Sequence, residues 1–153
     1  MPRLLSLTAS ALVLLALAAP FAGADRVYHT EHLALTPVGG APLRSGFVQN
    51  IKANGPIVYA HEIYKLTGAT PLATYTVTNN FFIGDTSCKK KGSLFAFDTA
   101  SFRTNRAGNG GADVKIAPED IGGLTGDHGV FWTLRNAADE VVYRTACTTV
   151  TLD

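Results

Sequence analysis

Apolar and polar residues alternate with a period of two along most of this chain, and each alternating run ends at a cluster of glycine and proline. Such alternation places one face of a strand in a core and the other face in solvent. The period of 3.6 that is typical of amphipathic helices is hard to find. The chain is therefore predicted to fold mainly into short β-strands.

About eight or nine strands are expected, with turn signals roughly every ten residues, which is the pattern of a sandwich or barrel. The alternating runs cover 26–35, 47–51, 57–66, 72–83, 94–98, 101–105, 112–116, 130–134 and one long final strand over 141–152. Residues 94–98 and 101–105 form either one strand or two, and only 118–121 suggests a helical turn. We predict an antiparallel, immunoglobulin-like β-sandwich, with a small closed β-barrel as the alternative.

The first residues have the anatomy of a secretory signal. A short basic start, Met1-Pro2-Arg3, precedes an apolar run from Leu4 to Ala19, and Ala22-Gly23-Ala24 has the small-x-small pattern of a cleavage site. The apolar run covers roughly 24 Å as a helix, which is short of the ~30 Å hydrocarbon core. We expect residues 1–24 to be removed, and residues 25–153 to form a single secreted or periplasmic domain without stable membrane insertion.

The charge balance excludes one class of partner. Thirteen Lys and Arg residues stand against twelve Asp and Glu, so the formal net charge is +1. A dedicated nucleic-acid-binding domain needs a marked basic excess. We therefore expect no nucleic-acid partner, and the hydrophobic share of 46% argues against a disordered chain.

The two cysteines are expected to form a disulfide. In an exported small domain, two cysteines most often pair with each other. The alternatives are a metal-binding thiolate pair or a catalytic nucleophile, but neither Cys88 nor Cys147 lies in a C-x-x-C motif. A bridge that closes a loop of about 60 residues stabilises the fold by roughly 4 kcal/mol in the chain-entropy model.

Two segments carry a resemblance to a family. The segment Gly68-Ala69-Thr70-Pro71-Leu72-Ala73-Thr74-Tyr75-Thr76-Val77 is similar to a proline turn followed by a Tyr-x-Val strand in exported sandwich modules, and 143–153 has a similar exported ending. With its signal and cysteine pair, the chain resembles small exported bacterial proteins with an immunoglobulin-like or fibronectin-type β-sandwich. The resemblance implies that fold and carries no assigned activity or functional residue.

Four histidines are the first candidates for chemistry. A metal site on a strand favours ligands at positions i and i+2, which share a face, but the chain has no His-x-His pair. His29, His61 and His128 could form a site only through tertiary contact, and no Gly-x-Ser-x-Gly nucleophile motif is present. Structural or surface histidines and no cofactor are the expectation.

A contact surface is the other candidate site. Phe81-Phe82 and Phe131-Trp132 are adjacent aromatic pairs, so one ring of each pair either packs on a second covered face or is exposed as a contact. Lys89, Lys90 and Lys91 form the only charge run, which either contacts an anionic surface or protects an edge strand from pairing. Phe82, Trp132 and the three lysines are the candidate contact residues.

These observations lead to two hypotheses of function. The first is a secreted or periplasmic, non-catalytic binding or structural module that contacts an extracytoplasmic protein or glycan. The second is a small metal-dependent or hydrolytic extracytoplasmic enzyme that uses a histidine cluster. Convergence of the histidines in a cleft is the observation that would separate the two.

Overall fold

The computed structural model describes residues 28–53, 60–121 and 123–152. The expected signal at 1–24 lies outside the described residues. The described strands are β1 (Tyr28–Ala34), β2 (Thr36–Pro37), β3 (Ser45–Ala53), β4 (Ala60–Thr67), β5 (Thr74–Phe82), β6 (Leu94–Arg103), β7 (Gly110–Ile116), β8 (Gly126–Arg135), β9 (Val141–Arg144) and β10 (Thr148–Leu152). A 3₁₀ turn, η1 (Lys91–Ser93), precedes β6, and the expected helical turn is the short helix α1 (Pro118–Ile121).

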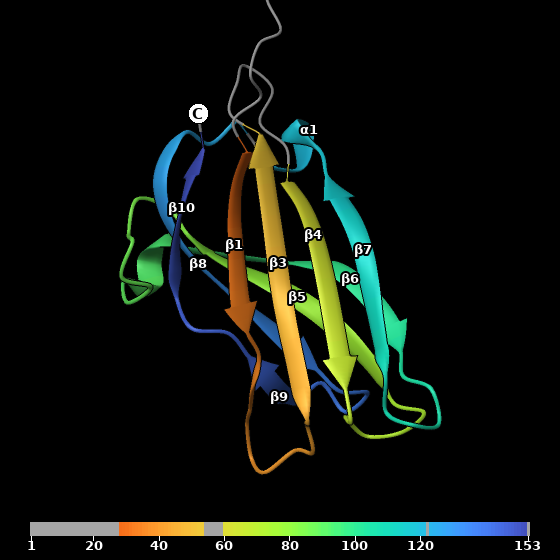
Figure 1. The fold of residues 1–153 in the computed structure, drawn as a ribbon. Coiled ribbons are helices and arrows are strands. Elements are labelled where there is room, and N and C mark those ends of the chain that lie inside the picture. The colour runs from red at the N-terminus through yellow and green to blue at the C-terminus, as the bar shows by residue number, and fades with distance from the viewer. Residues whose placement is uncertain (1–27, 54–59, 122, 153) are drawn as a thin grey trace, which may run out of the picture.

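The strands form two layers. The first sheet has the order β1-β3-β4-β7, and the second has the order β2-β9-β8-β5-β6, with β10 also paired to β8. Every pairing between these strands is antiparallel. Figure 1 shows the second sheet behind the first, with its strands running obliquely across those in front. The two sheets do not close into a barrel, so the predicted β-sandwich is confirmed and the barrel alternative is wrong.

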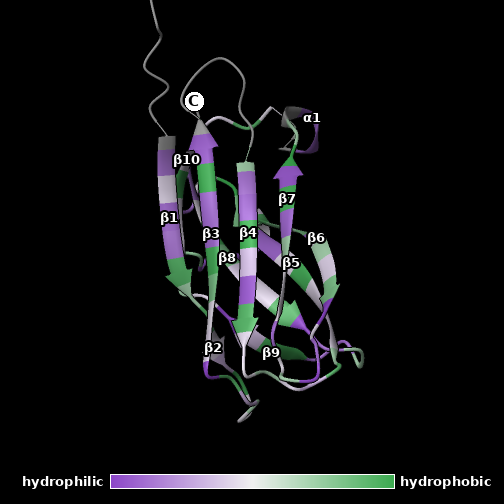
Figure 2. Ribbon diagram, turned by 45° about the vertical axis from the view of Figure 1, so that its right-hand side comes forward, coloured by the Kyte–Doolittle hydropathy of each residue, from purple (hydrophilic) through white to green (hydrophobic). Residues whose placement is uncertain are grey.

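The core lies between the sheets and follows the alternation in the sequence. Hydrophobic and hydrophilic residues succeed one another along single strands such as β3 (Figure 2). Val48 of β3 faces inward from the first sheet, Val77 and Leu134 face inward from the second, and all three are fully buried. Most inward positions of β5 and β8 are thus the apolar ones that the period of two predicts, and Asn79 and His128 are the polar exceptions.

The expected single strand over 141–152 is wrong, because β9 ends at Arg144 and β10 begins at Thr148. Arg144 lies opposite Thr133 and Thr148 opposite Val130, so the three residues 145–147 between β9 and β10 correspond to only two residues of β8. At this irregularity the Thr145 hydroxyl oxygen accepts a hydrogen bond from the Trp132 backbone N–H at 3.0 Å, in place of a partner on a neighbouring strand. An extra residue bends a strand, and the irregularity ends at Cys147.

A second irregularity settles the alternative left open at 94–105. β6 is one strand from Leu94 to Arg103, and its register with β5 shifts between Val77 and Thr78. Ala100 lies opposite Val77 and Asp98 opposite Thr78, so Thr99 is the extra residue. A bulge redirects the side chain of its extra residue, and that of Thr99 reaches Tyr64 of the first sheet, as described below.

Candidate functional site

One level of the core is polar. The register aligns Glu31 of β1, Asn50 of β3 and Glu62 of β4 across the first sheet. In the second sheet Asn79 of β5 lies opposite Trp132 of β8. Glu62 is 1% exposed and Trp132 is completely buried. A row of hydrogen-bonding groups therefore crosses each inner face where apolar side chains are the rule.

Glu62 is the centre of this polar level. The Tyr64 hydroxyl donates a short hydrogen bond to Glu62 Oε2, and Asn79 Nδ2 donates to Glu62 Oε1 at 3.2 Å. The Thr99 hydroxyl lies 2.7 Å from the Tyr64 hydroxyl. Because the single Tyr64 proton is directed at Glu62, Thr99 is the donor in the second contact. The β6 bulge thus completes a network that links both sheets.

Burial dominates the protonation of Glu62. Removal from water raises the pKa of the Glu62 carboxyl from 4.5 to about 7, while the donors Tyr64, Trp132 and Asn79 oppose the rise. Burial also raises the pKa of the Tyr64 hydroxyl, and the charge of Glu62 raises it further. The Glu62 carboxyl therefore titrates in the neutral range, whereas the Tyr64 hydroxyl keeps its proton.

The one lysine or arginine that is buried among the described residues is already paired. Lys52 of β3 is 3% exposed, and its Nζ lies 3.1 Å from Glu31 Oε1. Asn50 Nδ2 donates to the other oxygen of Glu31 at 3.2 Å. Across the described residues, the ion pairs within 4 Å do not include Glu62. The carboxylate form of Glu62 therefore lacks a counter-charge in this part of the chain.

A cavity of about 30 Å³ adjoins this network between the sheets. We call it the inter-sheet cavity, and its lining is Asn50, Lys52, Ala60, Glu62, Asn79, Phe81, Phe95, Phe97, Ile116, Leu124, Val130, Trp132, Val150 and Leu152. A polar cavity of roughly 10–15 Å³ is enough to hold a water molecule. The inter-sheet cavity therefore has room for water or for a small group of a ligand.

Three buried polar atoms of the cavity lining have no hydrogen-bond partner among the described residues. They are Asn50 Oδ1, Asn79 Oδ1 and Trp132 Nε1. The Trp132 indole lies close enough to Glu62 to lower its pKa, but its N–H forms no hydrogen bond of ordinary geometry. Leaving a buried polar atom unpaired costs about 1–3 kcal/mol of stability. A polar group in the cavity that formed hydrogen bonds with these atoms would remove this cost.

A surface groove adjoins the cavity at the edge where the sheets part. β6 ends the second sheet and β7 ends the first, and these two strands do not pair. A groove of about 320 Å³ lies there and shares Phe95, Phe97 and Ile116 with the cavity lining. The Phe95 and Phe97 rings lie 5.4 Å apart, and Phe95 is 48% exposed. We call this the aromatic groove, and its other lining residues, Asp98, Thr99, Lys115 and Asp120, are polar or charged.

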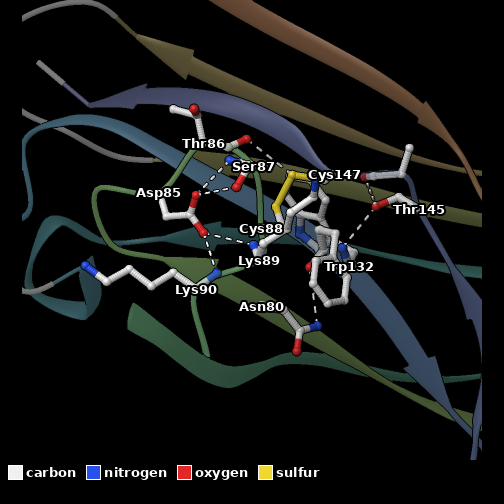
Figure 3. Close-up of a disulfide and its surroundings, with 12 residues drawn as sticks. Asn80, Asp85, Thr86, Ser87, Cys88, Lys89, Lys90, Trp132, Thr145 and Cys147 are labelled. Carbon is white, nitrogen blue, oxygen red and sulfur yellow. Dashed lines mark hydrogen bonds between the residues drawn. A yellow bond between two sulfur atoms is a disulfide. The ribbon is translucent and has the colours of Figure 1, made fainter. Parts of the chain in front are cut away.

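The predicted disulfide between Cys88 and Cys147 is confirmed, with an S–S distance of 2.04 Å (Figure 3). It fastens the segment after β5 to the segment between β9 and β10. The bridge indicates an oxidising, extracytoplasmic environment.

The Asp85 carboxylate organises the loop that carries Cys88 (Figure 3). It accepts hydrogen bonds from the Ser87 hydroxyl at 2.6 Å and from the backbone N–H groups of Ser87, Lys89 and Lys90 at 2.7–3.0 Å. These donors, led by the Ser87 hydroxyl, hold the pKa of the Asp85 carboxyl below its usual range. The loop is thus shaped by one carboxylate rather than by apolar burial.

The histidines are engaged separately. His61 Nε2 lies 2.6 Å from an Asp113 oxygen, whereas His128 Nδ1 accepts a hydrogen bond from the Gly84 backbone N–H at 3.0 Å. His29 is exposed on β1. Over the described ranges, no three His, Cys, Asp or Glu side chains come together as a metal site. The convergence that the enzyme hypothesis needs is not seen in this part of the chain.

The proposed contact surface needs correction at two of its aromatic residues. Phe82 is 5% exposed and Trp132 is fully buried, so neither offers an exposed ring. Trp132 packs into the core because even-numbered residues of β8 face inward, and its neighbour Phe131 faces outward and is half-buried. Lys89, Lys90 and Lys91 are exposed, and they lie just before β6, an edge strand.

The polar level is the feature that the sequence analysis missed. The available signal was a charged or amide residue at an inward position, such as Glu62 between Ala60 and Tyr64, or Asn79 between Val77 and Phe81. A polar residue at an apolar position of an alternating strand indicates a buried polar group.

Comparison of the chain with family models, curated proteins and solved structures finds no match in any of the three. Within residues 28–53, 60–121 and 123–152, no helix has the length and apolar character needed to cross a bilayer.

Proposed function

We propose that the chain is a secreted or periplasmic, non-catalytic binding module with an immunoglobulin-like sandwich, and that it takes one group of its ligand into the inter-sheet cavity. The expected signal at 1–24 and the disulfide support export. The ligand belongs to an extracytoplasmic protein, a glycan or a smaller molecule, whose remaining part lies in the aromatic groove.

One observation carries this proposal. Asn50 Oδ1, Asn79 Oδ1 and Trp132 Nε1 are buried without partners on the wall of one cavity. Native proteins satisfy nearly all of their buried polar atoms, so three such atoms around one space indicate that the space is filled by a polar group. The exposed ring of Phe95 at the mouth is the kind of apolar surface that binding sites present.

The test uses Trp132, which is the only tryptophan of the chain and lines the cavity. Small alcohols, amides, carboxylates and amines are titrated into the folded, oxidised protein, and the tryptophan emission is followed. We expect at least one class to cause a saturable change. The change should disappear in Ala60→Leu, which fills the cavity from its wall.

The matched control is Ala112→Leu, because Ala112 packs against the core on the same sheet but is not part of the cavity lining. It should retain the response. If no compound changes the emission of the folded protein, or if Ala60→Leu responds like the unmodified chain, the proposed binding site is wrong.

A further inference from the structure

The charges around the cavity favour a cationic occupant. Lys52 and Glu31 neutralise each other at 3.1 Å, whereas Glu62 has hydrogen-bond donors but no ion pair among the described residues. A buried carboxylate without a counter-charge is costly. A cation that enters the cavity would supply the missing charge, whereas an anion would face Glu62 directly.

The hydrogen-bonding groups also favour an occupant that donates. Asn50 Nδ2 donates to Glu31 and Asn79 Nδ2 donates to Glu62, so the network fixes the orientation of both amides. Their unpartnered atoms are therefore acceptors, whereas the third unpartnered atom, Trp132 Nε1, is a donor that lies close enough to Glu62 to lower its pKa. Together with the Glu62 carboxylate they offer three acceptors, and an ammonium group has three N–H donors and no acceptor.

The walls distinguish an organic cation from a metal ion. Calcium takes six to eight oxygen ligands, and magnesium requires a near-octahedral set. The inter-sheet cavity instead has aromatic rings, including Phe81, Phe97 and Trp132, and aliphatic side chains beside its few oxygens. Aromatic faces attract organic cations through the ring quadrupole, and the aliphatic walls suit a hydrocarbon substituent.

The sizes of the two hollows indicate how such a ligand would lie. The cavity of about 30 Å³ admits a head group of very few atoms, and the aromatic groove of about 320 Å³ has room for the remainder. We propose, on the basis of the function proposed above, that the inter-sheet cavity binds the primary ammonium group of an organic amine, with Glu62 as its counter-ion and the hydrocarbon part of the amine against Phe95 and Phe97.

The experiment compares three probes of similar shape: n-butylammonium, butan-1-ol and butyrate. Binding to the folded, oxidised protein at pH 8 is followed by calorimetry and by Trp132 emission. We expect n-butylammonium to bind at least tenfold more tightly than either of the others. In Glu62→Gln the preference should disappear, because the glutamine keeps the shape of the side chain without its charge.

Two variants serve as controls. Glu140→Gln removes an exposed carboxylate from the turn between β8 and β9 and should bind n-butylammonium like the unmodified chain. Phe97→Leu keeps an apolar wall but removes the aromatic ring, and it should weaken the binding of n-butylammonium more than that of butan-1-ol. Phe97→Leu leaves Glu62 in place, so it tests the proposal if Glu62→Gln does not fold.

The pH dependence gives a separate readout. A carboxyl with a pKa of about 7 is about one-tenth ionised at pH 6 and about nine-tenths at pH 8, so amine affinity should rise about tenfold over this range. The other titratable side chains around the cavity and groove are Glu31, Lys52, Tyr64, Asp98, Lys115, Asp120 and His128. If the rise comes from Glu62, it is absent in Glu62→Gln and for butan-1-ol.

The outcomes separate the two proposals. Equal or tighter binding of butan-1-ol or butyrate, or unchanged amine binding in Glu62→Gln, overturns the ammonium proposal and leaves the cavity as a binding site. Failure of all three probes to bind the folded protein overturns the ammonium proposal, and the wider compound panel then decides the proposed function independently.

Discussion

Substituting Glu62 by glutamine should make the folded protein more stable at neutral and alkaline pH. Glu62 is 1% exposed, and burial raises the pKa of its carboxyl from 4.5 to about 7. Glutamine has nearly the shape of the protonated carboxyl and never has to ionise in the core. Its oxygen can accept from Asn79 Nδ2 while its amide N–H donates to the Tyr64 oxygen, whose proton then turns to Thr99. The variant therefore removes the cost of burying a charge.

The sign and size follow from the two pKa values. Below about pH 4.5 the carboxyl is protonated in both the folded and the unfolded chain, so it contributes no pH dependence. Between 4.5 and about 7 the unfolded chain ionises first, and the free energy of unfolding falls. Above about 7 both states are ionised and the loss is complete, at about 3 kcal/mol. Glu62→Gln should lack this loss.

Urea unfolding at pH 4.5 and pH 8, followed by far-UV circular dichroism with the disulfide intact, measures the effect. The difference in unfolding free energy between Glu62→Gln and the unmodified chain should grow by about 3 kcal/mol between the two pH values. Glu140→Gln, at an exposed site, should show no such growth. A difference for Glu62→Gln that stays constant with pH would refute a buried carboxyl of raised pKa.

Three other perturbations test the disulfide and its loop. Cys88→Ala combined with Cys147→Ala should lower the free energy of urea unfolding by about 4 kcal/mol, because the bridge spans 59 residues, and a loss below about 1 kcal/mol would contradict this. Asp85→Ala should speed amide hydrogen exchange at Lys89 and Lys90, whose N–H groups bond to the Asp85 carboxylate. In the unmodified chain the lowered pKa of Asp85 should keep these two amides protected at pH 4, with protection lost only at more acid pH. Rapid exchange of both amides at pH 4 would contradict this role of Asp85. Gly129→Ala should destabilise by about 1–3 kcal/mol, since its Cβ would lie 2.3 Å from the Asp85 carbonyl oxygen, whereas Gly92→Ala has open space and should be neutral in the same urea assay.

The fold was predictable where alternation and turn residues act locally. The runs at 47–51, 72–83, 112–116 and 130–134 became β3, β5, β7 and β8, with boundaries that differ by a few residues. The final strand was not predictable in detail, because its interruption depends on Thr145 bonding to Trp132 and on an extra residue opposite β8. Closure into a sandwich rather than a barrel was equally beyond local pattern, since it depends on β6 and β7 remaining unpaired.

The disulfide was predictable because the chain has only two cysteines and its first 24 residues are expected to be an export signal. The cavity was not, because it arises from register across two sheets. Glu31, Asn50 and Glu62 are far apart in sequence and meet only through β1-β3-β4 pairing. Asn79 and Trp132 come from the facing sheet, and Thr99 enters through a bulge. Each residue alone resembles an ordinary polar position in a strand.

Direct titration of the Glu62 carboxyl by ¹³C NMR tests the central claim most closely. The chain has four glutamates, so selective labelling gives four carboxyl resonances, and the one absent from Glu62→Gln is assigned to Glu62. We expect its midpoint at about pH 7 and a shift to lower pH when n-butylammonium is added. A Glu62 titration midpoint at the ordinary pH of 4.5 that does not change when the amine is added would contradict a buried carboxyl that binds a cation.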